Sequence, residues 1–211
     1  TEGIAFSVDD KLKIARKLDD LGMHYVEGGF SDPNNRTDME FFARLRQEPL
    51  KHARLVAFGM TRRAGKSPDK DPGLQTLVSV GAPVAAFVAK TWDLHVTQAL
   101  RTSLDENLAM IRDSIRYAKD RGLEVGFDAE HFFDACKHNR DYALACLHAA
   151  EQAGADWICL CDTNGGALPR EVREALAAAT QAVSLPLGIH AHNDCELAVA
   201  NTLAAVEAGV T

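Results

Sequence analysis

The sequence repeats one structural unit, and this repeat restricts the fold more than any other feature. In most units a helical pattern ends at a glycine, the usual left-handed C-cap of a helix, and a short apolar segment follows. These segments predict strands whose starts are about 30 to 40 residues apart, the length of one βα unit. The predicted strands cover 25–30, 54–59, 84–90, 124–130, 157–163 and 187–192.

Strands that alternate with helices predict an α/β fold with a parallel sheet. Two architectures fit, a doubly wound sheet and a (β/α)8 barrel. Polar residues occur at the C-terminal ends of nearly all the predicted strands, and a barrel brings all those ends to one mouth. The Gly-rich phosphate loop typical of a doubly wound sheet is not found in the sequence. We therefore expect a (β/α)8 TIM barrel.

Closing such a barrel requires eight strands, whereas six are predicted here. We therefore expect residues 1–211 to be a partial catalytic TIM-barrel domain that lacks the first and last strands, with a genuine six-stranded domain as the alternative. Within it, Ser7 and Ser103 are expected to cap helices. A further helix is expected over 194–208 with Leu203 facing inward, and residues 62–71 are expected to form a surface loop.

Composition excludes several classes of function. The net charge of -7 and the pI of about 5.6 argue against nucleic-acid binding. No apolar run approaches the roughly 20 residues that cross a bilayer, and no signal peptide is recognised, so no membrane association is expected. The five cysteines are odd in number and lack a C-x-x-C spacing, which favours free thiols in a reducing cytoplasm.

His190 and His192 are the strongest candidates for chemistry. They lie two residues apart at the end of a predicted strand, so both imidazoles leave the same face. Two adjacent imidazoles form a bidentate pair for a divalent metal ion. The alternative is that ordinary hydrogen bonds satisfy both rings, and the spacing alone does not choose between these interpretations.

Carboxylates follow several of the other strands. A metal site with two histidines needs an acidic ligand as well, and four candidates cannot be separated by spacing: Glu27, Asp128, Glu130 and Asp162. Asp128 and Glu130 share one strand face, where each would raise the pKa of the other and permit acid–base work. The alternative for this pair is a salt bridge to a neighbouring cation.

Two further residues could hold an anionic substrate. Lys90 ends a predicted strand and could bind the anion, or it could form an ion pair with Glu130 or Glu27. Thr163 precedes a pair of glycines, so its hydroxyl could donate to a substrate carboxylate where the backbone can come close. The alternative for this segment is a turn that leads into a helix.

Several of these segments together resemble one enzyme family. Residues 188–194 (GIHAHND) with 196–201 (ELAVAN) resemble the signature of the 2-isopropylmalate, homocitrate and citramalate synthases. The segments over 25–29, 90–95, 127–134 and 162–166 are similar to the citramalate synthase branch. The resemblance covers the whole chain. It implies a metal-dependent TIM-barrel acyltransferase that condenses acetyl-CoA with a 2-oxo acid.

The resemblance also implies a role for each site residue. His190 and His192 correspond to metal ligands for Mg²⁺, Mn²⁺ or Zn²⁺, and Glu130 to the catalytic acid at the mouth. The substrate-binding positions implied are Thr163, Glu27 and His95, to which Lys90 is added from its position at a strand end. Pyruvate as the 2-oxo acid would give citramalate, a step towards isoleucine and the branched-chain amino acids. We expect the full-length protein to be a cytoplasmic homodimer.

Departures from the family pattern leave alternatives open. The family's Arg-Asp pair, which includes a metal ligand, would precede Thr1, so we expect residues 1–211 to be inactive alone. The loop over 31–36 differs from the usual Pro-Gly-Ser-Asn-Pro, which puts its substrate contacts in doubt. The remaining alternatives are 2-isopropylmalate synthesis from 2-oxoisovalerate, and a metal-dependent lyase or aldolase that cleaves a hydroxyacyl-CoA.

Overall fold

A computed structural model describes residues 4–210, and it contains six parallel strands in one sheet with the order β1 to β6. Each strand pairs with the next one along the chain, as in a barrel. The strand bounds are β1 Tyr25–Phe30, β2 Arg54–Met60, β3 Val84–Lys90, β4 Glu124–Glu130, β5 Trp157–Asp162 and β6 Leu187–Ala191. All six agree with the predicted strands to within one residue at either end.

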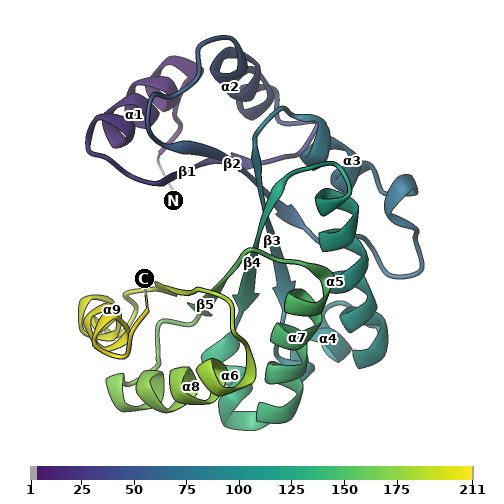
Figure 1. Ribbon diagram of the computed structural model, residues 1–211, viewed down its shortest axis with the longest axis vertical. Helices are drawn as coiled ribbons and strands as arrows, with labels where there is room; N and C mark the ends of the chain where they lie inside the picture. The colour runs from purple at the N-terminus through teal and green to yellow at the C-terminus, as the bar shows by residue number, and fades with distance from the viewer. Residues whose placement is uncertain (1–3, 211) are drawn as a thin grey trace.

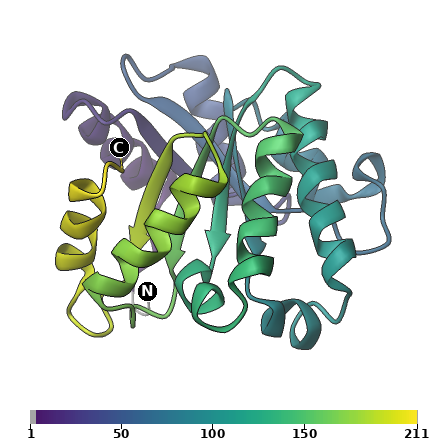
Figure 2. The same ribbon diagram turned by 60° about the horizontal axis from the view of Figure 1, so that its bottom comes forward.

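The sheet curls into an open half-barrel with its helices on the outer side (Figures 1 and 2). Strands β1 and β6 form the two edges of the sheet and are not paired with each other. This arrangement is a partial (β/α)8 barrel, as predicted. The α-helices are α1 Val8–Asp20, α2 Arg36–Gln47, α3 Pro72–Ser79, α4 Asp93–Gln98, α5 Leu104–Lys119, α6 Phe132–His138, α7 Arg140–Ala153, α8 Pro169–Ala182 and α9 Ala198–Glu207.

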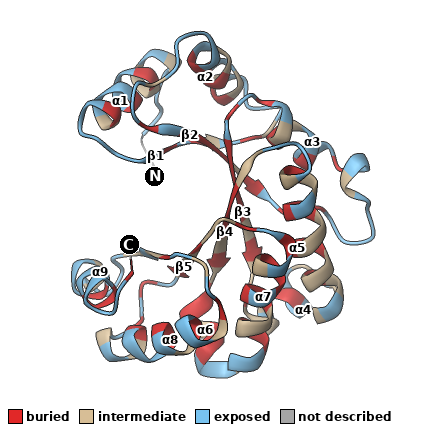
Figure 3. Ribbon diagram, in the orientation of Figure 1, coloured by how far each residue is buried: buried red, intermediate tan, exposed pale blue. Residues whose placement is uncertain are grey.

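Alternation along the strands separates the two faces of the sheet. Phe87, Phe127 and Ile158 are fully buried in the main core between the sheet and the helices. Val56 and Val84 belong to a second, smaller cluster on the concave face. Burial is accordingly concentrated on the strands and on the sheet-facing sides of the helices (Figure 3). None of the helices in the described part of the chain is long and apolar enough to span a membrane.

The helix ends follow the predicted signals. The Ser7 side chain accepts from the Asp10 backbone N–H while Asp10 reaches back to Ser7, which completes a capping box. Ser103 caps α5 in the same way through the backbone N–H of Glu106. Gly154, which ends α7, adopts φ 94°, a left-handed conformation that a side chain would disfavour.

Helix α9 begins later than predicted. The expected start was Asp194, but the helix begins at Ala198 because Glu196 takes the left-handed conformation, with φ 58°. The Asn193 side chain accepts from the Ala198 backbone N–H and stabilises this turn. The expectation for Leu203 was also wrong, since it is 58% exposed.

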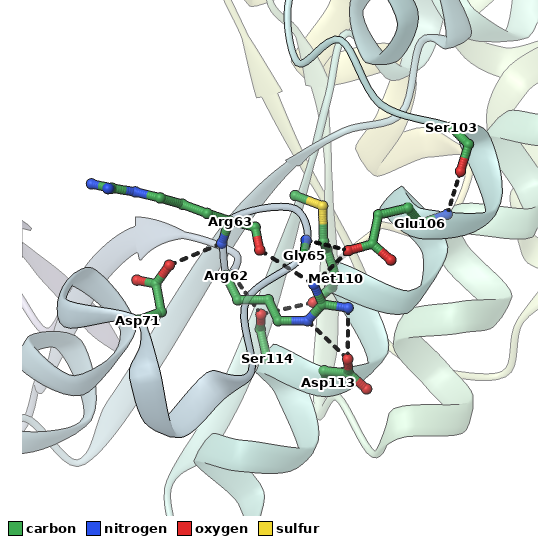
Figure 4. A network of polar contacts seen from close by, with 9 residues as sticks. All are labelled: Arg62, Arg63, Gly65, Asp71, Ser103, Glu106, Met110, Asp113 and Ser114. Carbon is green, nitrogen blue, oxygen red and sulfur yellow. Dashed lines mark hydrogen bonds and ion pairs between the residues drawn. The ribbon is translucent and has the colours of Figure 1, made fainter.

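The segment 62–71 was expected to lie on the surface, yet Arg62 is 5% exposed. Figure 4 shows its polar contacts. Its guanidinium contacts Glu106 and Asp113 on α5 at 2.7 and 2.8 Å. Its backbone N–H donates to the Ser114 hydroxyl at 2.8 Å. Two carboxylates therefore neutralise the buried charge, and the loop after β2 is attached to α5. Residues 63–67 are exposed, as predicted.

Candidate active site

Three predicted site residues lie on the concave face, at the C-terminal ends of their strands. Lys90 on β3 is the register partner of Glu130 on β4, and Cys161 on β5 is the partner of His190 on β6. Since Ile189 packs into the core on the helix side, its neighbour His190 faces the concave side. The fold thus brings these side chains to one mouth.

Lys90 and Glu130 form an ion pair. Lys90 Nζ lies 2.5 Å from Glu130 Oε2, and the side chains are 19% and 21% exposed. Of the interpretations weighed for Lys90, the contact with Glu130 is therefore the one that the structure contains. Glu130 Oε2 accepts no directed hydrogen bond in the described structure. It could therefore still accept one from a further group at the mouth, and the Lys90 ammonium could still donate one.

The two histidines lie side by side, with ring centroids 4.8 Å apart. His192 Nδ1 is 2.8 Å from the Thr163 carbonyl oxygen and 3.2 Å from that of Asp162. Because carbonyls only accept, the proton belongs on Nδ1 and Nε2 keeps its lone pair. Burial, and secondly His192, lower the pKa of His190, which favours its neutral form. Both features suit metal ligands.

A third ligand is not evident in the part of the chain that the structure describes, where no three His, Cys, Asp or Glu side chains are grouped suitably for a metal ion. Asp162 is 1% exposed. Its carboxylate accepts from the backbone N–H groups of Gly166 and Ala167 at 3.3 and 3.2 Å. Asp162 therefore holds the turn after β5, which was the alternative for that segment.

Asp128 and Glu27 form the second acidic feature. Burial raises the pKa of Asp128 to about 7, and the second cause is Glu27 on β1 rather than Glu130, which the sequence argument paired with it. Glu130 lies two residues further along β4, paired with Lys90 instead. Partial desolvation also raises the pKa of Glu27, although this residue on the edge strand β1 is still exposed to solvent. The two carboxyl groups therefore interact across the concave face.

His95 lies in α4, beside the mouth, within a cluster of rings. Its ring centroid is 4.8 Å from that of Trp92 and 4.3 Å from that of His131. Burial, followed by His131 and Lys90, lowers the pKa of His95. The imidazole is therefore neutral near pH 7 and able to accept a proton.

A family model described as HMGL-like matches residues 1–211. The chain belongs to the HMGL-like family. The (R)-citramalate synthase of Geobacter sulfurreducens is 51% identical to this chain. The match covers 99% of this chain and 39% of the synthase. Homocitrate synthase from Methanopyrus kandleri is 37% identical over 99% of the chain and 49% of its own length. Five relatives at 45 to 52% identity are all named (R)-citramalate synthase, which supports that branch of the family.

Solved structures of HMGL-like proteins share the fold. A hydroxymethylglutaryl-CoA lyase from Pseudomonas aeruginosa superimposes with a TM-score of 0.79 at 19% identity, over 99% of this chain and 69% of that one. The likeness at this identity concerns the architecture. The HMGL-like chain thus spans about two fifths of the curated citramalate synthases that it matches, and about two thirds of the lyase.

A cavity of about 410 Å³ adjoins the mouth of the HMGL-like barrel. The loops after β1 and β2 and the end of α4 form its walls, which include Met60, Leu100 and Met110. Ser31 is 2% exposed in this wall, and its hydroxyl has no hydrogen-bond partner in the described structure. The cavity wall is mainly apolar but also includes Arg62, Arg63 and Asp71, and the Ser31 hydroxyl is left unpaired in it.

Sequence reasoning missed His131, although it quoted the segment that contains this residue. His131 directly follows Glu130, is 8% exposed and has φ 59°. A non-glycine residue in the left-handed region after a strand is uncommon. The sequence alone carries no signal for that conformation, so the residue is recognised only in the structure.

Proposed function

We propose that the full-length protein condenses acetyl-CoA with pyruvate to give citramalate, with the help of a divalent metal ion. The carrying observation is the adjacent His190–His192 pair, on the same concave face as the Lys90–Glu130 ion pair. Identity of 45 to 52% to (R)-citramalate synthases supports this activity over the 2-isopropylmalate synthase and lyase alternatives.

In this proposal His190 and His192 hold the metal ion, which is Mg²⁺, Mn²⁺ or Zn²⁺. A bound divalent ion supplies Lewis-acid polarisation of the keto group of the 2-oxo acid. His192 suits the role because its Nδ1 is occupied by the two backbone carbonyls, which orients the ring. The remaining ligands belong to residues outside the described part of the chain or to the substrates.

The chain's own residues bind the substrates and move protons. Thr163 and Lys90 hold the carboxylate of the 2-oxo acid, since one can donate a hydrogen bond and the other is a cation. The Thr163 hydroxyl oxygen already accepts from the His131 N–H at 2.8 Å, so its own proton is free to donate. Glu130 positions the acetyl group and transfers protons, while Glu27 and His95 line the pocket.

The acyl-CoA arm fits the cavity beside the mouth. Pantetheine is a thin chain with apolar segments and two amides, and the cavity offers apolar walls with the unused Ser31 hydroxyl. Leu100, which follows α4 and lines the cavity, is linked to His95 because its N–H donates to the His95 carbonyl at 3.0 Å. An arm bound there would lead its thioester towards the mouth.

The test uses the full-length protein with acetyl-CoA and one 2-oxo acid at a time. Pyruvate should release free CoA, detected with a thiol reagent, and citramalate should accumulate. Faster release with 2-oxoisovalerate would favour 2-isopropylmalate synthesis. The absence of release with any 2-oxo acid, together with cleavage of a hydroxyacyl-CoA, would refute the synthase and favour a lyase.

A paired substitution tests the metal ligands. His190→Ala should abolish metal-dependent activity and lower the stoichiometry of bound metal, measured by elemental analysis after dialysis. His148→Ala is the matched control, because His148 is exposed on α7 and lies outside the site. Unchanged metal content in His190→Ala would contradict the assignment.

The compartment and the oligomeric state complete the proposal. All five cysteines are free in the structure, which supports a reducing compartment such as the cytoplasm. We place the protein there as a homodimer, which light scattering of the full-length protein would test. A monomeric mass would contradict the dimer.

A further inference from the structure

His131 occupies a conformation that is costly for its residue type. Its φ of 59° and ψ of 29° are left-handed, where glycine or asparagine is normally found. The backbone is held on both sides, because its N–H donates to the Thr163 hydroxyl at 2.8 Å and its carbonyl accepts from Ala135 at 2.9 Å. If only the turn mattered, glycine would satisfy it without strain, so the presence of an imidazole at this position needs an explanation.

The His131 ring is held at its Nδ1 side. Nδ1 lies 3.4 Å from Asp134 Oδ2, and the Asn164 amide donates to this same oxygen at 2.9 Å. A carboxylate facing Nδ1 favours the tautomer with its proton on that nitrogen. Asn164 belongs to the turn after β5, so the orientation of the imidazole is tied to a second barrel strand.

The His131 ring also contacts the ring of His95. The two rings meet edge to face, with centroids 4.3 Å apart and planes at 85°. His95 is also packed against Trp92 at 4.8 Å. The His95 ring is thus enclosed between an indole and the imidazole of His131. This imidazole cannot turn without losing its contact to Asp134, while Thr163 holds the backbone N–H of the same residue.

We propose that His131 is a positioning residue, which Asp134 and Thr163 hold in place so that it fixes the orientation of the His95 ring at the mouth. The inference rests on the proposed function, in which His95 lines the substrate pocket. A misplacement of about 1 Å at such a group costs about 100-fold in rate. The contact can therefore contribute to turnover without any contact between His131 and the substrate.

The ionisation of His95 reports this contact independently of turnover. The charged or titratable groups that face His95 are His131 and Asp134 from the start of α6, Lys90 from β3 and Glu130 from β4. After burial, His131 is the largest of the influences that lower the pKa of His95. Removal of the His131 imidazole should therefore raise the pKa of His95 while the other groups stay in place.

The decisive variant is His131→Asn in the full-length protein. Asparagine tolerates the left-handed conformation, so the turn is kept and only the imidazole is lost. With pyruvate and acetyl-CoA, kcat should fall about 100-fold, whereas KM for pyruvate should change by less than about threefold. A kcat within about threefold of the original protein would overturn the inference, because the turn would then be the whole role of the residue.

His138→Asn is the matched control. His138 is exposed on the same helix, and its ring stacks on the other partner of His95, with a centroid distance of 5.3 Å to Trp92. This variant should leave kcat within about twofold. An equal loss in both variants would also overturn the inference, since the effect would then be general to the ring cluster.

Proton NMR titration of His95 separates this inference from the proposed function. In His131→Asn the pKa of His95 should rise towards its ordinary value of 6.5, whether or not the protein releases CoA from acetyl-CoA. If the pKa rises and no 2-oxo acid is converted, the proposed function fails and the ring contact stands. If the pKa is unchanged, the inference fails. Should His131→Asn unfold, Asp134→Asn replaces it, with kcat as the readout because Asp134 itself raises the pKa of His95. Loss of the contact at Nδ1 of His131 should then lower kcat, and a kcat within about threefold of the original protein would overturn the inference.

Discussion

Replacing Asp128 by asparagine should stabilise the protein at alkaline pH and have little effect in acid. Burial, and secondly Glu27, raise the pKa of Asp128 from 3.8 to about 7 in the folded state. Between those values the unfolded chain has released this proton while the folded chain still keeps it. The difference corresponds to at most about 4 kcal/mol of unfolding free energy, since one pKa unit is about 1.4 kcal/mol.

The direction of the effect follows from the raised pKa. Below pH 3.8 the carboxyl is protonated in both states and its burial costs little. As the pH rises towards 7 the unfolded state becomes increasingly favoured, and above 7 the full cost is present. Asparagine removes the ionisation, so the gain in stability should grow from about 1 kcal/mol at pH 4.5 to about 4 kcal/mol at pH 8.

Urea unfolding of the full-length protein at these two pH values, followed by tryptophan fluorescence, measures the gain. Glu27→Gln is the informative control. It removes the smaller cause of the raised Asp128 pKa and leaves the burial, so the gain in stability from Asp128→Asn in this background should still grow with pH but be smaller. Asp10→Asn should show little difference between the two pH values, because hydrogen bonds to Ser7 lower the pKa of Asp10 from 3.8 and its titration lies in more acidic solution. An Asp128→Asn gain of equal size at pH 4.5 and pH 8 would refute the reasoning.

Four stability changes follow from the packing, each measured as a free energy of unfolding. Ser7→Ala should cost about 1 kcal/mol, because the capping box is lost; no loss would show that the cap contributes nothing. Gly126→Ala should cost about 1–3 kcal/mol, since a Cβ would lie 2.1 Å from the Trp157 ring. Ile115→Ala should cost about 2–5 kcal/mol, because the side chain is fully buried. Arg62→Met should cost about 3 kcal/mol by leaving two carboxylates without their cation, and a cost below about 0.5 kcal/mol would mean that solvent already screens them.

Most strands could be predicted closely because they are signalled twice, whereas β2 and β6 follow helices that end without a glycine and depend on the apolar pattern alone. A glycine with positive φ ends the preceding helix, as Gly122 does at φ 77°, and an apolar stretch then follows with period two. Both signals are local, and the observed β4 has the predicted bounds. The adjacency of His190 and His192 was confirmed for the same reason, since period two alone places both rings on one face.

The features that were missed depend on distant parts of the chain. Arg62 is polar and flanked by loop residues, yet it is buried because its carboxylate partners lie 44 and 51 residues further along the chain. The start of α9 moved because Glu196 is left-handed and Cys195 N–H donates to the Gly165 carbonyl at 3.3 Å. A pattern of hydrophobic residues contains neither contact. The same holds for Asp128, whose acidic partner lies three strands away.

Strand β4 shows how partners decide the use of similar side chains. It carries three acidic residues that all point to the concave face, because they are two or four residues apart: Glu124, Asp128 and Glu130. At the N-terminal end, Glu124 accepts from the Tyr25 hydroxyl at 2.5 Å and from the Trp157 indole at 3.1 Å, and it also forms an ion pair with Arg54.

The acidic groups further along β4 are less fully satisfied. Asp128 has only another acid as its charged neighbour, and Glu130 has a single cation. A carboxylate with three donors has little capacity left for a substrate, whereas one with few partners can still exchange a proton or bind one. The chemistry of this half-barrel should therefore be confined to the C-terminal half of β4, while Glu124 closes the opposite end. Glu124→Gln should accordingly lower stability without changing KM for pyruvate, and a change in KM with unaltered stability would contradict this division.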